Sequence, residues 1–262
     1  MGEPDLRVPV EVIRVAALGP IPHGFLGRRG GVSRGVHAGL NVGWGSDDER
    51  DAVAENRRRA VAAVLPGAAL VTVHQVHSPG VVTVTAPWPD DSRPQADALV
   101  TDRPGLLLGV LTADCAPVLL ADAEAGVIGA AHAGWKGALA GVTDATIAAM
   151  EALGASRTRI AAAIGPCIAQ ASYEVGPDLR DAVLADNPDD KNFFATGQRA
   201  ERWQFDLPGY CAARLTAAGL TAIARTGADT CAEEENFFSH RRRTLSAGGP
   251  IGHQISVIAL AD

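Results

Sequence analysis

The stretch TADCAPVLLADAEAGVIGAAHAGWKG, residues 112–137, predicts the centre of the fold. It holds two apolar runs separated by a turn at residues 124–126, a pattern typical of two buried strands joined as a hairpin. Polar side chains stand at the strand ends, where Cys115 follows Asp114 and where His132 precedes a glycine-rich segment. Strands are rigid supports, so side chains at these ends can reach a ligand. A buried structural role for Cys115 remains the alternative, because free cysteine is often buried.

Composition narrows the class of protein. The chain has 262 residues, and we expect one domain over residues 1–262, because no repeat and no long linker interrupts it. Its four cysteines lie far apart, which favours reduced thiols and a cytoplasmic location. Charges interrupt the apolar residues of the N-terminal segment, so we expect neither a secretion signal nor a membrane span. The net charge of −7 argues against a nucleic-acid partner.

The segments around the central hairpin predict alternating strands and helices. We expect a first strand over residues 8–18 and a helix from a Ser46/Glu49 capping box to about residue 65. A strand over residues 69–77 would pair with residues 81–85 as a hairpin, and its alternation would place His74 and His77 on opposite faces. A helix is expected over residues 138–153. Further strands near the C-terminus complete an α+β fold, with mixed β-sheets layered with helices.

Three side chains form the candidate site, and they come from three different strand ends. His77, Cys115 and His132 are residue types that zinc prefers, and three protein ligands leave a position open for catalysis. Their spacing is not that of a zinc finger. Residue chemistry equally allows a thiolate nucleophile at Cys115 with His132 or His77 as its base.

Several ordered motifs resemble the signature blocks of one family across nearly the whole chain. They are Gly30-Gly31-Val32-Ser33, Leu40-Asn41-Val42-Gly43, Gln75-Val76-His77, Thr112-Ala113-Asp114-Cys115, His132-Ala133-Gly134-Trp135-Lys136-Gly137, Ile164-Gly165-Pro166-Cys167 and Phe237-Phe238-Ser239-His240-Arg241-Arg242. The chain thus resembles the laccase-domain family, also called the polyphenol oxidoreductase, purine nucleoside phosphorylase or peptidoglycan-editing-factor family. Two departures are the acidic run at residues 233–235 and His253, which stands where an arginine would be expected.

The resemblance implies a zinc site at His77, Cys115 and His132, with copper as the alternative metal. It implies a layered fold similar to that of some cysteine-dependent deamidases. The implied activities are phosphorolysis of adenosine, inosine and methylthioadenosine, and deamination of adenosine. The partners would then be small molecules, a purine nucleoside and phosphate, and the oligomeric state stays open.

Roles for further residues follow from the resemblance and from residue chemistry. Deamination needs a carboxylate that moves protons, for which Asp114 and Glu174 are candidates beside Cys115. Phosphate is best held by cations. The candidate substrate-binding residues are Asn41, Arg57, Lys136 and Arg241.

Three other functions are alternatives to the predicted purine nucleoside enzyme. A copper-dependent polyphenol oxidase needs many clustered histidines, whereas this chain has seven, scattered singly. A zinc-free cysteine hydrolase or amidase that edits a peptidoglycan precursor would use Cys115 as nucleophile. A metal-stabilised binding protein would use the same ligands without turnover.

Overall fold

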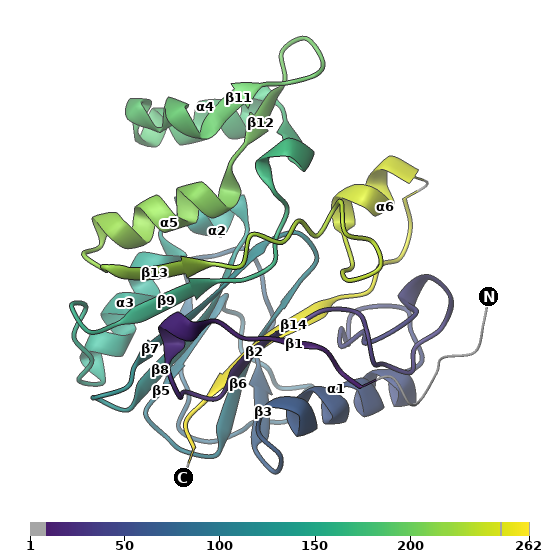
Figure 1. Ribbon diagram of the computed structural model, residues 1–262, viewed down its shortest axis with the longest axis vertical. Helices are drawn as coiled ribbons and strands as arrows, with labels where there is room; N and C mark the ends of the chain where they lie inside the picture. The colour runs from purple at the N-terminus through teal and green to yellow at the C-terminus, as the bar shows by residue number, and fades with distance from the viewer. Residues whose placement is uncertain (1–8, 247, 262) are drawn as a thin grey trace.

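The computed structural model describes residues 9–246 and 248–261 (Figure 1). Within these residues the strands form three sheets. The five-stranded sheet has the order β1 (Val12–Ile13), β2 (His23–Leu26), β14 (Gln254–Ala259), β6 (Leu106–Thr112) and β3 (Ala69–Thr72). The six-stranded sheet has the order β13 (Ala222–Arg225), β9 (Ala161–Ile164), β7 (Ala116–Asp122), β8 (Val127–Ala133), β5 (Ala98–Thr101) and β4 (Val81–Thr83). Both large sheets mix parallel and antiparallel pairs.

A smaller sheet and the helices complete the described part of the chain. The small sheet has the order β10 (Glu174–Val175), β12 (Trp203–Phe205) and β11 (Phe194–Thr196). The α-helices are α1 (Arg50–Val64), α2 (Trp135–Leu139), α3 (Val142–Ala152), α4 (Pro177–Asp186), α5 (Leu207–Ala217) and α6 (His240–Ser246). The 3-10 turns are η1 (Ala16–Leu18), η2 (Gly35–His37), η3 (Gln170–Ser172) and η4 (Pro188–Phe193). Across residues 9–246 and 248–261, none of these helices has the length and apolar character needed to cross a membrane.

The two large sheets pack face to face between two layers of helices. Helix α1 covers the outer face of the five-stranded sheet, where Val61 and Val64 join a core cluster with Leu107. Helices α3 and α5 cover the outer face of the six-stranded sheet. Figure 1 shows α4, β11 and β12 projecting at the top of the molecule. This layering confirms the predicted α+β class with mixed sheets covered by helices.

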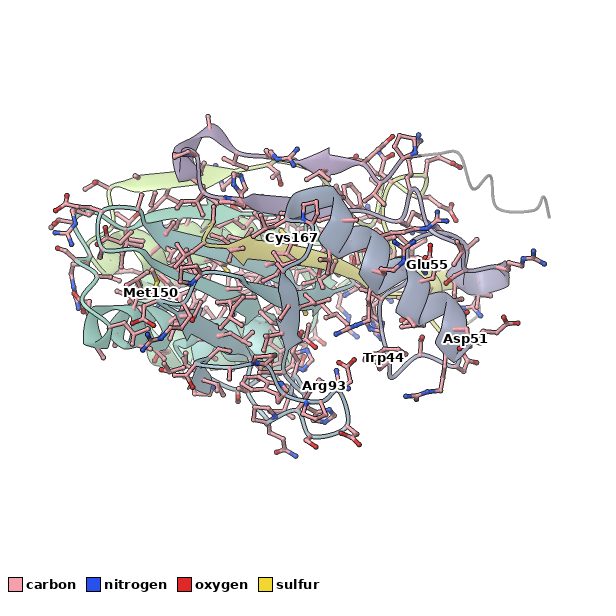
Figure 2. All side chains as sticks on the ribbon, turned by 90° about the horizontal axis from the view of Figure 1, so that it is seen from below. Trp44, Asp51, Glu55, Arg93, Met150 and Cys167 are labelled. Carbon is pink, nitrogen blue, oxygen red and sulfur yellow. The ribbon has the colours of Figure 1, made fainter. Side chains whose placement is uncertain are left out.

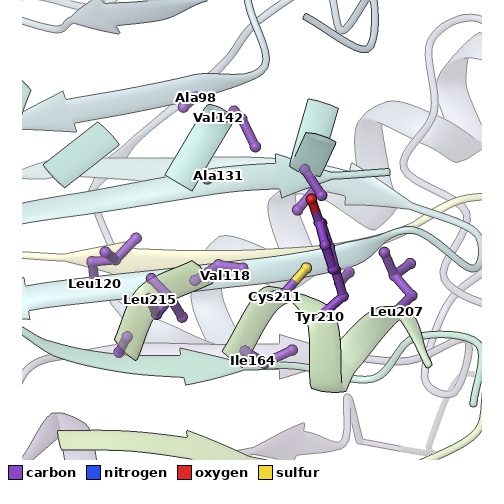
Figure 3. Close-up of a cluster of buried hydrophobic side chains, with 14 of the residues drawn as sticks. Ala98, Val118, Leu120, Ala131, Val142, Ile164, Leu207, Tyr210, Cys211 and Leu215 are labelled. Carbon is purple, nitrogen blue, oxygen red and sulfur yellow. The ribbon is translucent and has the colours of Figure 1, made fainter. Parts of the chain in front are cut away.

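The central hairpin is buried on both faces, as its continuous apolar runs predicted. Along β7, Val118 and Leu120 point toward the helices, and Figure 3 shows them in one cluster with Leu215 of α5. Leu119 points the other way, into the core between the two sheets. Successive side chains alternate between faces of a strand, so a strand buried on both sides must be apolar at nearly every position. Strands β7 and β8 pair antiparallel, as expected.

The strand predicted over residues 69–77 is much shorter in the structure, and its expected hairpin is wrong. Strand β3 ends at Thr72, and the chain then runs irregularly to His77, whose φ is +60°. The alternation used to place the two histidines therefore does not apply. Strand β4 pairs with β5 in the other large sheet rather than with β3.

Other boundaries also differ. Within the described residues the first strand covers Val12–Ile13, and 3-10 turn η1 follows it; residue 8, where the predicted strand starts, lies outside them. Helix α1 begins after Glu49, and Ser46 Oγ donates to the carbonyl of Gly43 instead of capping the helix. The helix predicted over residues 138–153 is divided at Gly141, whose φ of +84° is a conformation that glycine adopts readily.

Asp122, at the end of β7, provides a test of the hairpin's stability. Its fully buried carboxylate accepts from the amides of Ala125 and Ser156 and pairs with Arg159 at 2.9 Å. Burial by itself would raise the pKa of Asp122, but Arg159 and the amides outweigh it and lower the pKa. Asp122→Asn should cost about 1–3 kcal/mol near neutral pH, because it weakens these bonds and brings amide hydrogens against buried donors.

This cost should depend on pH in one direction. A carboxylate whose folded-state pKa is depressed stabilises the protein above its unfolded pKa of about 4, and loses that effect as pH falls through the folded value. Urea unfolding at several pH values should therefore show the gap between wild type and Asp122→Asn narrowing below about pH 4. Asp181→Asn, on an exposed side of α4, is the control and should change stability by less than about 0.5 kcal/mol. A gap that stays constant with pH would contradict the assignment.

Candidate metal centre

His77, Cys115 and His132 converge at one point. One ligand atom from each lies within 4.8 Å of the others. Cys115 Sγ is 3.8 Å from His77 Nε2, and the two imidazole rings meet edge to face with centroids 4.8 Å apart. Among the residues that the structure describes, this is the one such group of His, Cys, Asp or Glu side chains placed to hold a metal ion.

The fold brings these residues together from three segments. Residues 113–115 carry the chain from β6 in one large sheet to β7 in the other, so Cys115 lies where the two sheets meet. His132 lies on β8 opposite Pro117 of β7. His77 follows β3 of the five-stranded sheet. Cys115 and His132 are thus held at or next to strand ends, whereas His77 lies in the irregular segment after β3, where its amide donates to Asp97.

A buried carboxylate, Asp97, links two of the ligands. Asp97 Oδ1 accepts from His132 Nδ1 at 2.8 Å and from the amide of His77 at 3.0 Å. Its Oδ2 accepts from the amides of Val76 and Ser78 and from the Ser78 hydroxyl. Burial by itself would raise the pKa of Asp97, yet these hydrogen bonds outweigh burial and lower it. The side chain is therefore an anion in the folded protein.

The charges at the site favour a thiolate. Burial by itself would raise the pKa of the Cys115 thiol, but the charge of His132 and hydrogen bonds from both histidines lower it. Burial would lower the pKa of His132, but the Cys115 thiolate and Asp97 raise it. A thiolate is the form of cysteine that binds metals. The site therefore presents Cys115 in its ligating form.

Gly134 leaves room for the group. A Cβ at this position would lie 2.8 Å from His77 Cδ2 and 2.9 Å from Cys115 Sγ, which is closer than packed atoms tolerate. Two imidazole nitrogens and one thiolate suit zinc, and three protein ligands leave a fourth position for a reactant. Three features fit a bound metal ion: the donor atoms, the space beside Gly134, and the hydrogen bond from His132 Nδ1 to Asp97.

The cluster faces a cavity of about 830 Å³. Aromatic side chains from three segments line it, namely Trp44, Trp135 and Tyr173. Figure 2 shows Trp44 and Arg93 on the same side of the molecule, and both line this cavity. Cationic side chains also line it, namely Arg93, Lys136 and Arg241. The cavity therefore offers stacking surfaces and positive charge beside the three ligands, although the whole chain is acidic.

His253, the departure noted in the sequence, also lines this cavity. Burial and the nearby charges of His132 and His240 lower the pKa of His253 to about 4. Its imidazole is therefore neutral at physiological pH. The cavity wall holds an uncharged ring at the position where the family resemblance would put a guanidinium.

Three further predicted residues lie on the cavity wall, and their contacts differ. Asp114 has φ +94°, and its carboxylate accepts from the Thr230 hydroxyl and from the amide of Arg241. Arg241 donates to the carbonyl of Glu174 and lies 5.4 Å from the ring of Tyr173. The exposed Lys136 has its Nζ 5.6 Å from the ring of Trp135.

The structure does not bring the other three predicted residues to the cavity. The Glu174 carboxylate instead binds the side chain and amide of Arg199. Arg57 is buried and donates to the carbonyl of Val42 and the hydroxyl of Thr72.

Asn41, the last of them, acts at a distance from the cluster. It is fully buried, and its Oδ1 accepts from the amides of Gly43 and His253. Both of these residues line the cavity. Asn41 therefore holds two parts of the wall in place.

Sequence reasoning missed Asp97, although the signal was present. It is an acid inside the apolar segment Ala96-Asp97-Ala98-Leu99-Val100. An ionised group at a buried strand position is costly unless it is paired, so such an acid indicates a partner elsewhere in the fold.

Substituting Gly134 tests the packing of the cluster. Gly134→Ala should remove most bound metal, because the new methyl group must push His77 and Cys115 apart. Gly137→Ala is the matched control, since a Cβ there meets its neighbours at 3.4 Å or more. Elemental analysis of the two purified proteins measures the metal content. Equal metal content in both variants would show that the space beside Gly134 is not required.

Comparison with known proteins gives the family. The sequence profile of the family described as multi-copper polyphenol oxidoreductase laccase matches residues 22–261. A purine nucleoside phosphorylase from Deinococcus radiodurans is 44% identical over 250 residues, covering 92% of this chain and 89% of that protein. Another from Streptomyces griseus is 43% identical over 221 residues, covering 83% of this chain and 87% of that protein.

Solved structures share the fold. The protein NMB0706 of Neisseria meningitidis has a TM-score of 0.86 at 32% identity, over 97% of this chain and 99% of that one. YfiH of Bacillus licheniformis has a TM-score of 0.87 at 28% identity, over 97% of this chain and 98% of that one. Because the profile match and these alignments each span most of the sequence, the chain belongs to the multi-copper polyphenol oxidoreductase laccase family, as its ordered motifs predicted.

Proposed function

We propose that this chain is a zinc-dependent purine nucleoside phosphorylase that acts on adenosine, inosine and methylthioadenosine and also deaminates adenosine. One observation carries the proposal: the three potential metal ligands lie at the wall of a cavity that also holds aromatic and cationic side chains. The relatives named purine nucleoside phosphorylase support it. The four free cysteines are consistent with action in the cytoplasm.

Zinc is the proposed metal because the site has two imidazoles and one thiolate. When bound there, zinc would supply Lewis-acid catalysis. Copper oxidases of phenols need several histidine-rich metal sites. Within the described residues one group of three ligands is found, which favours a single zinc ion over a multicopper centre.

The aromatic residues are the proposed contacts of the purine. Trp44, Trp135 and Tyr173 come from different segments and line the same cavity. A purine ring presents a flat apolar face, and stacking against an aromatic side chain fixes its plane. Neutral His253 adds a polar group that can hydrogen-bond an uncharged base.

The cations are the proposed contacts of phosphate. In phosphorolysis a phosphate oxygen forms a bond to C1′ of the ribose while the bond from C1′ to the purine breaks. Lys136 and Arg241 can bind the attacking phosphate anion and hold it next to C1′ of the ribose. Arg241 is already oriented through its bonds to Asp114 and Glu174.

Asp114 is the proposed proton carrier in deamination. It is the carboxylate among the described residues that line the cavity. Both of its oxygens accept hydrogen bonds, from Thr230 and Arg241, so the carboxylate is held in one orientation. Such a fixed group can accept a proton from attacking water and deliver it to departing ammonia.

A second candidate function rests on a different property of the same residues. Cys115, His132 and Asp97 form a chain in which the carboxylate orients the imidazole and the imidazole lowers the pKa of the thiol. This order of groups is that of a cysteine hydrolase. Without metal, the chain would then cleave an amide, for example in a peptidoglycan precursor.

Metal analysis and turnover separate the two functions. Wild type should contain about one zinc per chain and release adenine from adenosine only with phosphate, with slower ammonia release as the sign of deamination. Cys115→Ala should lose both metal and activity, because the thiolate is one of three ligands. Cys231→Ala, which removes a half-buried thiol outside the group, should keep both. Full metal content in Cys115→Ala would remove Cys115 from the ligand set, and a zinc-free wild type that cleaves an amide only with Cys115 in place would favour the thiol hydrolase.

The two lysines of the chain provide a matched pair for the phosphate site. Lys136 lines the cavity, whereas Lys191 lies in η4, away from it. Lys136→Ala should raise the KM for phosphate about tenfold or more, because a charged contact contributes about 1.5–3 kcal/mol. Lys191→Ala should leave it unchanged. Steady-state kinetics at varied phosphate measures both, and equal KM values would remove Lys136 from the site.

A further inference from the structure

We propose that Asp97 is the positioning residue of the metal centre, and that it selects Nε2 of His132 as the ligating nitrogen while holding His77 in place. The inference rests on the proposed metal site. It adds a role for a residue that neither binds the metal nor touches the substrate.

The contacts of Asp97 leave it a single orientation. All five hydrogen bonds to its carboxylate come from donors, two on Oδ1 and three on Oδ2. Its backbone is also fixed, since its amide donates to Gly80 and its carbonyl accepts from the amide of His132. A fully buried carboxylate held in this way is a rigid reference point for whatever bonds to it.

The bond to His132 decides which nitrogen faces the site. A neutral imidazole has one protonated nitrogen and one with a free lone pair. Because an ionised carboxylate can only accept, His132 Nδ1 keeps its proton when the ring is neutral, so Nε2 is the nitrogen that a metal ion can bind by displacing the proton there. A carboxylate on the far nitrogen of a ligating histidine also makes that ligand more basic.

The bonds to residues 76–78 hold the second histidine. Three successive amides, of Val76, His77 and Ser78, point at the one carboxylate. These three hydrogen bonds bend the chain and account for the left-handed φ of +60° at His77. This conformation costs energy for a residue with a side chain. The hydrogen bonds to Asp97 therefore offset the backbone strain at His77 and hold its ring next to Cys115.

Asparagine in place of Asp97 should disturb either the protonation of His132 or the turn at residues 76–78. An amide has one oxygen and one NH₂ group, and both ends of Asp97 face donors. If the NH₂ group faces His132, that ring can accept only at Nδ1, which moves its proton to Nε2 and blocks ligation. If it faces residues 76–78, the amides that shape the turn lose their acceptor. Either orientation weakens metal binding.

The test compares two buried carboxylates. Asp97 and Asp122 are both fully buried, lie at strand ends of the six-stranded sheet and accept from backbone amides. Zinc affinity is measured by competition with a chromophoric chelator, on samples that circular dichroism shows to be folded. Asp97→Asn should bind zinc roughly 10- to 100-fold more weakly. Asp122→Asn should stay within about twofold of wild type, although both variants are less stable.

A second measurement uses the wild type alone and does not depend on the folding of a variant. In the zinc-loaded protein, nitrogen-15 NMR of the imidazoles should show the proton of His132 on Nδ1. Unchanged zinc affinity in a folded Asp97→Asn, or a proton on Nε2, would overturn the role of Asp97 and leave the zinc site standing. Absence of zinc binding by wild type would overturn the proposed function itself, and this inference with it.

Discussion

The hydrogen bonds of the buried Asp97 carboxylate are the interaction on which the arrangement of His77 and His132 depends. Moving an ionised carboxylate out of water is costly unless hydrogen bonds replace the lost hydration. Here the donors come from the segment after β3 and from β8, while Asp97 itself precedes β5. The two segments must approach together to satisfy the charge. The same contacts that make burial tolerable therefore assemble two of the three ligands.

The layers around this carboxylate follow from apolar patterning. Strands β6, β7 and β8 are apolar on both faces, so they can only lie inside a stack. Helices α1 and α3 have one apolar stripe each and close the outer faces. The stack leaves the strand ends open toward loops. The cavity and its ligands lie at these ends, where backbone and side chains are free to meet a reactant.

These two levels of structure differ in how far the sequence predicts them. The central hairpin was predictable because its pattern is local and continuous. The grouping of His77, Cys115 and His132 was predictable because their motifs resemble those of a family. The partner of Asp97 was not, since His132 lies 35 residues away and the pairing depends on which strands become neighbours. The position of His77 was predicted wrongly for a related reason. Hydrogen bonds from residues 76–78 to Asp97 bend this segment, so it does not continue as a strand.

Charged residues show the same limit. Arg57 and Lys136 both looked suited to an anion, but only tertiary contacts distinguish them. Arg57 donates to a carbonyl and a hydroxyl in the core and pairs with Asp90, while Lys136 lines the cavity. A single sequence gives the charge of a side chain and not the contacts that satisfy it. Side chains of the same charge can therefore be assigned different roles only when the fold is known.

The position of Cys115 has a consequence for the durability of the protein. Its segment crosses from one large sheet to the other, while His77 follows the first sheet and His132 belongs to the second. An ion shared by these three side chains ties the sheets together as a cross-link does. An ion that binds only the folded chain stabilises it by about 4 kcal/mol at a thousand times its dissociation constant. Zinc bound at the proposed site would thereby stabilise the packing of the two sheets as well as supply chemistry.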